Sequence, residues 1–237
     1  VQGYRRRVVV ADLLGTGTAA LVWSSPLPQA QPALRYVQLL PHKPHLLVRS
    51  TNNLGEATTV RYAPSTRFAA EDRLAGRPWV TRLPFPVHVV ERVDVHDLVG
   101  GNRFTTTYRY HHGCFDADER EFAGFGLVET LEADDRTDDD GALRPWRPPT
   151  LTRTWHHCGT AAVPALWPTG EGWRGDPQAE LGRTAPSPAG LRALRGQVLR
   201  TEVYGVDDGP LAAVPYSVTQ HDYAVRELQP VNSKTGH

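Results

Sequence analysis

Alternating apolar and polar positions recur along most of the chain, and this pattern predicts β-strands. The segment 86–97 shows the alternation over its full length. One face is expected to carry Val87, Val89, Val93 and Val95, and the other His88, Arg92, Asp94 and His96. Further strands are expected at 7–11, 20–23, 34–39, 45–49, 57–62, 103–112, 120–131, 151–157, 197–204 and 216–226.

Glycine and proline punctuate the whole chain. The 237 residues include 21 Gly and 20 Pro, which is typical of many short strands joined by turns. Between two expected strands, the sequence Asn-Asn-Leu-Gly at 52–55 predicts a hairpin. One helix is expected at 188–195, with Ser187 as its cap and Gly196 as its stop. The pattern therefore predicts an all-β fold of extended strands and hairpins, with at most one short helix.

The composition is that of an ordinary globular chain. Hydrophobic residues make up 40% and charged residues 22%, with a mean hydropathy of −0.42, which excludes wholesale disorder. The formal net charge is 0, so no overall field favours nucleic acid or an anionic membrane surface. No run approaches the roughly 18 apolar residues of a membrane-spanning helix. Because the chain lacks Met and begins with Val1, we expect an internal piece of a longer reading frame.

An abrupt change in composition divides the chain near its middle. The segment 132–140 holds six acidic residues and one Arg, and a stretch rich in Pro and Trp follows it. Such a run is typical of a solvated loop or linker. We therefore expect one module to end at residue 140 and another to begin at 141.

Two groups of histidine and cysteine are candidates for metal binding. The first is His111, His112 and Cys114, and the second is His156, His157 and Cys158. Together they could fill a tetrahedral zinc site. However, adjacent residues on a strand point to opposite faces, so neither pair of histidines converges easily. Polar histidines at strand ends are the simpler interpretation, and whether Cys114 and Cys158 pair is left open.

Other chemically suggestive residues have plainer interpretations. The acidic residues Asp116, Asp118, Glu119 and Glu121 surround Arg120, which indicates a charged turn rather than an acid/base pair in a cleft. No nucleophile elbow of the type G-x-S-x-G and no H-E-x-x-H sequence is present. We therefore predict no catalytic, metal-binding or cofactor-binding residues and no enzymatic activity. The alternative is a metal-dependent hydrolase or zinc-binding module that uses the two His/Cys groups.

The glycine-rich loop near residue 12 has the outline of a calcium-binding loop from a β-propeller blade. That loop type holds Ca²⁺ through several side-chain oxygens. Only Asp12 remains here, since Leu14, Thr16 and Ala20 occupy positions where further ligands would stand. We expect a metal-free turn that keeps the geometry of the loop.

A set of motifs, in this order, resembles one protein family. The motifs are KPHLL (43–47), NNLG (52–55), VRYAPSTRF (60–68), AGRPW (75–79), LPFPVHVVER (83–92), NRF (102–104), YRYHHG (108–113) and EREFAGFG (119–126). They closely resemble the middle region of the B component of Tc insecticidal toxin complexes, which is related to the N-terminal region of the plasmid virulence protein SpvB. Later segments, LTRTW (151–155), ALRG (193–196), LRTEVY (199–204) and PYSVT (215–219), resemble the next module of the same proteins.

This resemblance implies a structural role without catalysis. In that family, a β-propeller docks on a pore-forming A component, and β-rich sequence joins Rhs/YD-repeat sequence in a shell. The shell encloses the toxic C-terminal part of the C component. By this resemblance, residues 1–24 are the end of a degenerate propeller, and 25–140 and 141–237 are two modules of the shell. The implied partners are the C and A components, with no nucleic acid and no membrane insertion. The implied localisation is secreted, after a cytoplasmic stage.

Overall fold

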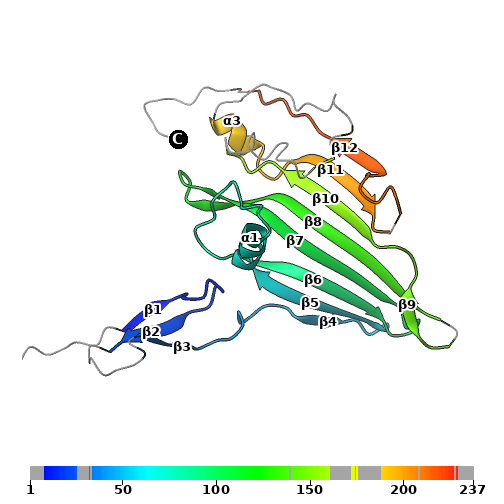
Figure 1. Ribbon diagram of the computed structural model, residues 1–237, viewed down its shortest axis with the longest axis horizontal. Coiled ribbons are helices and arrows are strands. Elements are labelled where there is room, and N and C mark those ends of the chain that lie inside the picture. The colour runs from blue at the N-terminus through cyan, green and yellow to red at the C-terminus, as the bar shows by residue number, and fades with distance from the viewer. Residues whose placement is uncertain are drawn as a thin grey trace, which may run out of the picture.

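Two antiparallel sheets make up most of the fold (Figure 1). The computed structural model describes residues 8–25, 32, 34–138, 140–160, 172–173, 175, 188–207, 209–226 and 228. The smaller sheet has the order β1-β2-β3, with strands Val8–Ala11, Ala20–Ser24 and Leu34–Gln38. All three lie close to the predicted positions.

The larger sheet has nine strands, in the order β12-β11-β10-β8-β7-β6-β5-β4, with β9 paired to β8. Its strands are β4 (Arg49–Thr51), β5 (Glu56–Pro64), β6 (His88–Asp97), β7 (Arg103–Asp116), β8 (Glu121–Thr137), β9 (Leu143–Pro145), β10 (Thr150–His156), β11 (Val198–Gly205) and β12 (Ser217–Gln220). Two helices occur among the described residues, α1 (Ser65–Leu74) and α3 (Pro188–Ala193). The predicted all-β class is confirmed.

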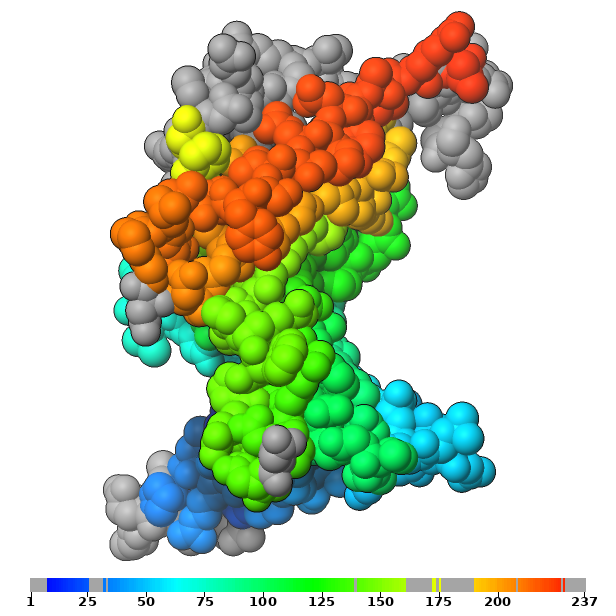
Figure 2. Space-filling view, turned by 90° about the vertical axis from the view of Figure 1, so that its right-hand side faces the viewer, coloured from blue at the N-terminus to red at the C-terminus, as the bar shows by residue number. Residues whose placement is uncertain are grey.

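The hairpin of β7 and β8 lies at the centre of the larger sheet. Its register runs from Arg103 opposite Asp135 to Asp116 opposite Glu121. Figure 2 shows these strands, in green, between the blue N-terminal sheet below and the orange and red C-terminal strands that cross the upper part of the molecule. The sheet runs without a break across residues 140 and 141, because β8 pairs with β10.

A β-bulge in β6 changes the expected alternation of its side chains. Arg92 pairs with Arg61 and Val90 pairs with Tyr62, so Glu91 is an extra residue. One extra residue shifts every following side chain to the opposite face. The prediction that Val89 and Val93 share a face is therefore wrong, and Val89 lies on the face of Arg92 instead.

The pattern did not predict α1, so the expectation of at most one short helix is wrong. The buried residues of this helix are Ser65, Phe68 and Asp72. Their spacing is helical, but two of the three are polar, so hydrophobic periodicity cannot reveal the helix. The expected helix at 188–195 is confirmed as α3, which ends at Ala193, while Ser187 lies outside the described residues.

Two predicted strands are shorter than expected. In the segment 45–49 only Arg49 belongs to β4, and His45 has a left-handed φ of 62°, which excludes it from a strand. The segment 216–226 is a strand only over β12. None of the helices in the described ranges is long and apolar enough to span a membrane.

A buried apolar cluster lies toward the upper ends of β7, β8, β10 and β11, on the side of α3 (Figure 1). This core consists of Cys114, Ala123, Leu127, Trp155, Cys158 and Leu199. By contrast, all three valines of β1 are more than half exposed. The smaller sheet therefore presents uncovered apolar surface within the described part of the chain.

Candidate functional site

One face of the larger sheet carries a line of charged and polar side chains, which we call the charge ladder. It begins on α1 and crosses β7, β8, β10 and β11. Its members are Asp72, His111, Glu129, Arg153, Tyr204, Glu202 and Arg200. The register brings the central members together, because Arg153 lies directly opposite Glu129 on β8 and Glu202 on β11.

The α1 end of the ladder is held by short contacts. His111 Nδ1 lies 2.7 Å from Asp72 Oδ2, and both side chains are almost fully buried. Trp79 Nε1 also donates to Asp72 Oδ2, at 2.7 Å. On the next strand, Arg153 Nε donates to Glu129 Oε1 at 2.8 Å. The ladder thus fastens α1, and the segment carrying Trp79, to the middle of the sheet.

The other end of the ladder is organised around Glu202, whose side chain is 0% exposed. Its Oε1 accepts hydrogen bonds from Arg200 Nε at 2.6 Å and from the backbone N–H of Trp173 at 3.0 Å. Its Oε2 accepts from the hydroxyl of Tyr204 at 2.6 Å. Since a buried charge is tolerated only when it is paired and hydrogen-bonded, these contacts explain how Glu202 remains in the interior.

The contacts of the ladder shift the pKa values of Glu129 and His111. Burial by itself would raise the pKa of Glu129, but the imidazole of His111, whose Nε2 lies 3.6 Å from Glu129 Oε2, and the charge of Arg153 outweigh it and lower that pKa to about 2. Burial would lower the pKa of His111, yet the carboxylates of Glu129 and Asp72 outweigh it, so the pKa of His111 is raised. Both shifts favour the charged forms, so His111 and Arg153 form ion pairs with Glu129.

Because the pKa of Glu129 is lowered, the free energy of unfolding is expected to decrease at acid pH. In the unfolded chain its pKa is near the ordinary 4.5, and in the folded chain it is about 2. Its contribution is therefore complete above about pH 4.5 and is lost as the pH falls toward 2, a change of roughly 3 kcal/mol. Urea unfolding at pH 7 and at pH 3 measures the loss. Glu129→Gln is expected to flatten this pH dependence, and an unchanged pH dependence in that variant would contradict the assignment.

A second buried carboxylate lies on the same face, toward the lower end of the sheet. Asp94 Oδ1 accepts from Arg92 Nη2 at 2.7 Å, from Arg103 Nη2 at 2.8 Å and from the Thr105 hydroxyl at 2.8 Å. The hydrogen bonds from Arg92 outweigh burial and hold the pKa of Asp94 far below its ordinary value. The charged residues Arg92, Asp94 and Arg103 thus bind one another on neighbouring strands, which stiffens the sheet.

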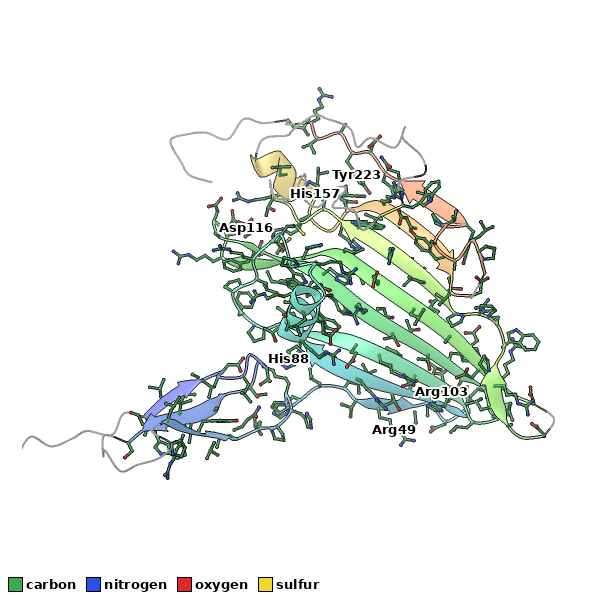
Figure 3. All side chains as sticks on the ribbon, in the orientation of Figure 1. Arg49, His88, Arg103, Asp116, His157 and Tyr223 are labelled. Carbon is green, nitrogen blue, oxygen red and sulfur yellow. The ribbon has the colours of Figure 1, made fainter. Side chains whose placement is uncertain are left out.

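The predicted charged turn of Asp116, Asp118, Glu119 and Glu121 binds α3 and the turn that follows it. Arg195 Nη2 lies 2.7 Å from Asp116 Oδ2 and Arg195 also pairs with Glu121. Arg192 lies 3.2 Å from Asp116 Oδ2 and 2.9 Å from Asp118 Oδ2. We call these contacts of Arg192 and Arg195 the arginine clamp. Figure 3 shows Asp116 at the α3 end of β7 and Arg103 at the other end.

The two His/Cys groups share one buried cluster through Cys114 and Cys158, but their histidines hydrogen-bond other residues. His111 belongs to the charge ladder, while His112, with a φ of 56°, accepts a hydrogen bond from the Val80 backbone at 3.4 Å. His157 Nδ1 accepts one from the Gly159 backbone at 2.8 Å. The described ranges hold no group of three or more His, Cys, Asp or Glu side chains placed to bind a metal. The hydrolase and zinc alternative therefore has no converging ligand set in this part of the molecule.

Asp12 organises its own loop. Its carboxylate oxygens accept hydrogen bonds from the backbone N–H groups of Thr16, at 2.9 Å, and Gly17, at 2.7 Å. The loop in turn contacts α1, since the Thr66 hydroxyl donates to the carbonyl of Gly15 at 2.5 Å. The carboxylate thus acts as a turn-forming group, and the loop that it shapes contacts α1 through the carbonyl of Gly15.

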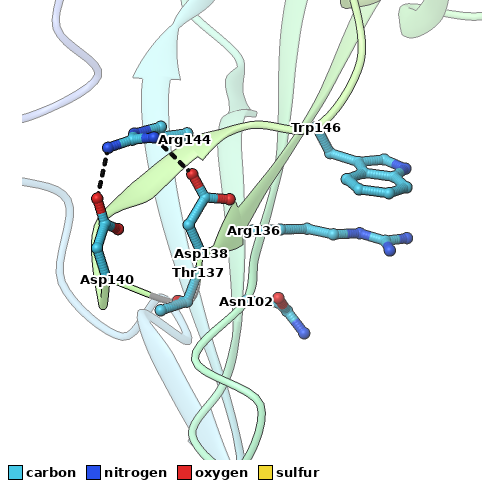
Figure 4. A pocket seen from close by; sticks show the side chains of 7 residues that line it. All are labelled: Asn102, Arg136, Thr137, Asp138, Asp140, Arg144 and Trp146. Atoms are coloured by element: carbon cyan, nitrogen blue, oxygen red, sulfur yellow. Dashed lines mark hydrogen bonds and ion pairs between the residues drawn. The ribbon is translucent and has the colours of Figure 1, made fainter.

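A pocket of about 660 Å³ opens at the lower end of the sheet, beside the turn between β8 and β9 (Figure 4). Arg144 lies between Asp138 and Asp140, at 2.9 and 2.6 Å. Across the pocket, the guanidinium of Arg136 lies 3.9 Å from the ring centre of Trp146. The ion pairs and the cation–π contact that line the pocket join residues of the β8–β9 hairpin region to one another. They indicate a stabilised turn rather than a reaction centre.

Comparison with known proteins identifies the family. The model of the insecticide toxin TcdB middle/N-terminal region matches residues 3–159, and that of the middle/C-terminal region matches residues 190–236. No curated protein matches.

Solved structures agree with these two matches. A crystal structure of TcdB2-TccC3 has a TM-score of 0.81 and 34% identity, covering 96% of this chain and 12% of that chain. The Photorhabdus luminescens Tc holotoxin pore has a TM-score of 0.75 and 34% identity, covering 92% of this chain and 11% of that chain. This chain thus spans about an eighth of the length of the matched chains, and it belongs to the TcdB insecticide toxin family, in the middle region of the Tc toxin B component.

Proposed function

We propose that this chain is a non-catalytic wall segment of a Tc toxin shell. The observation that carries the proposal is a single antiparallel sheet that runs through both matched regions, from β4 to β12. Within the described residues, β4 and β12 each pair on one side only. An unpaired edge is a template for another strand, so this sheet is suited to continue into neighbouring wall sequence.

The internal pairing of charges supports a wall instead of a catalyst. The acidic and basic side chains of the charge ladder and the arginine clamp pair with one another, across strands and between β7 and α3. Such contacts resist shear between strands and hold one shape. A container that keeps an enclosed polypeptide apart from its surroundings requires this stiffness.

We further propose the organisation and partners of the segment. Residues 1–24 form the end of a β-propeller, 25–140 the first shell module and 141–237 the second. The exposed valines of β1 and the turn of Asp12 support the propeller assignment. The shell encloses the toxic C-terminal part of a C component and couples it to a pore-forming A component in a secreted complex. Structural neighbours that contain TccC3 and a holotoxin pore support these partners.

A proline at the outer edge of β12 tests the wall proposal. His221 N–H donates to Leu199 O, and Thr219 lies opposite Thr201, so alternation directs the N–H of Val218 away from β11. In the intact protein, Val218→Pro removes one outward donor and spares the bonds to β11. We expect this variant to lose stable assembly with its C component, measured by size-exclusion chromatography. Val218→Thr, which keeps the N–H, is the matched control, and normal assembly of Val218→Pro would count against the proposal.

A further inference from the structure

Three turns project together from the lower end of the larger sheet. The register places the strand ends beside these turns in one row, formed by Glu56, Asp97, Arg103, Asp135 and Pro145 on neighbouring strands. Figure 1 shows this row at the end of the sheet where β9 lies. We call the segments that form or border the turns the turn tip, which consists of residues 52–56, 97–103, 135–138 and 140–146.

Five large apolar side chains of the turn tip are exposed, each between 45% and 86%. They are Leu54, Leu98, Val99, Leu143 and Trp146. The first two turns touch, because the N–H of Leu98 donates to the carbonyl of Gly55 at 2.8 Å. The second turn touches the end of β8, where the Thr137 hydroxyl donates to the carbonyl of Gly101 at 2.5 Å. An apolar group gathered at one end of a sheet, rather than scattered singly, is typical of an interaction surface.

The turns of this surface are ordered by their own hydrogen bonds. Asp97 Oδ1 accepts from the backbone N–H groups of Val99 and Gly100, at 3.0 Å each. In the third turn, the N–H of Asp138 donates to the carbonyl of Ala142 at 2.9 Å. Because these bonds use backbone groups of the turns, a partner would be recognised through side chains and not by adding a strand. An ordered surface also loses little conformational entropy on binding.

The turn tip has more acidic than basic residues. Its segments hold five Asp or Glu residues and three Arg residues. Arg144 is shared between Asp138 and Asp140, and Arg103 pairs at 2.8 Å with Asp94, which lies outside the turn tip. The surface therefore keeps an excess of negative charge. A partner that brings basic groups together with apolar side chains would complement it.

We propose that the turn tip binds a segment of the C component in which apolar side chains stand beside Arg or Lys. The proposal rests on the function proposed above, which gives the C component as a partner of this chain. The apolar side chains of the segment would cover Leu54 and Val99, and its basic groups would balance the excess acids, among them the exposed Glu56. Such a contact combines an apolar centre with a polar rim, as protein interfaces do.

Photocross-linking in the intact protein identifies what covers this surface. The photoreactive amino acid p-benzoylphenylalanine replaces Leu54, which is 86% exposed. The protein is assembled with its C component, irradiated, digested and analysed by mass spectrometry. We expect residue 54 to be cross-linked to a peptide of the C component. The same replacement at Leu74, which is 88% exposed on α1, is the matched control and is expected to give no cross-link to the C component.

A charge reversal tests the predicted chemistry of the partner. Glu56→Lys is expected to slow assembly with the C component about fivefold at low salt, because a charge at the rim of an interface acts mainly on the association rate. High salt is expected to reduce the difference. Glu119→Lys, in the turn at the other end of the sheet, is the matched control and is expected to leave the rate unchanged. An unchanged rate for Glu56→Lys at low salt would overturn the assignment of a basic partner.

Failure of this proposal can be told apart from failure of the wall proposal. If the parent protein assembles with its C component on size-exclusion chromatography, but residue 54 is cross-linked only within its own chain or to nothing, the turn tip is not the contact and the wall proposal stands. If the parent protein does not assemble with its C component at all, both proposals are wrong.

Discussion

Glu202→Ala is expected to lower the free energy of unfolding by about 3–5 kcal/mol, the usual cost of removing one member of a buried ion pair. Glu202 is the most buried carboxylate of the charge ladder, with a side-chain exposure of 0%. Its removal leaves Arg200, whose side chain is 6% exposed, without its carboxylate, and leaves the Tyr204 hydroxyl without its acceptor. Urea unfolding of the variant and the parent protein measures the difference.

A matched control separates the effect of removing a buried carboxylate from the effect of removing any carboxylate that pairs with an arginine. Glu119→Ala also removes a glutamate that pairs with an arginine, but its side chain is 53% exposed. We expect it to change stability by less than about 0.5 kcal/mol. Replacing Arg200 and Glu202 together with leucine is expected to recover part of the loss, since no unpaired charge remains. Equal effects of Glu202→Ala and Glu119→Ala would contradict the ladder as a structural element.

Phe68→Ala is expected to cost about 3–5 kcal/mol, the range for truncating a buried phenylalanine. Phe68 is 1% exposed and is the one large apolar residue that α1 buries. Its ring lies 5.6 Å from that of Tyr110, edge to face. Loss of this anchor is expected to loosen α1 and with it Asp72, the first member of the charge ladder. Denaturant unfolding, monitored by the far-ultraviolet signal, measures the effect.

The control for this prediction lies in the same helix. Leu74→Ala truncates another large apolar residue of α1, but Leu74 is 88% exposed. We expect its effect to stay within about 0.5 kcal/mol. A Phe68→Ala variant as stable as Leu74→Ala would show that α1 is not anchored through its buried face.

Most strands of this protein can be predicted from its sequence, because the alternation of apolar and polar residues and the turn residues are local signals. The hairpin at 52–55 is an example: Asn52 Oδ1 accepts from the backbone N–H groups of Leu54 and Glu56, as a turn-forming residue does. The bulge at Glu91 could not be foreseen, because a register shift is decided by pairing with β5. Helix α1 was missed because its buried stripe is mostly polar.

The charge ladder was also missed, although the sequence contains a signal for it. Glu129, Arg153 and Glu202 each occur within a strand and beside threonine, where an apolar residue is more usual. Which of these charges meet depends on the order and register of β8, β10 and β11, and that is long-range information. For the same reason the acidic turn was correctly expected to be a charged turn, but its partners, Arg192 and Arg195, lie more than 70 residues away.

The proposed wall segment requires the sheet to continue beyond its two edges in the assembled toxin. Hydrogen exchange of the intact protein in complex with its C component tests this directly at β12, where alternation directs the amides of Val218 and Gln220 outward. A neighbouring strand would hydrogen-bond these amides, so we predict that they exchange as slowly as those of Thr219. Exchange at the rate of unprotected amides in the complex would contradict a wall segment.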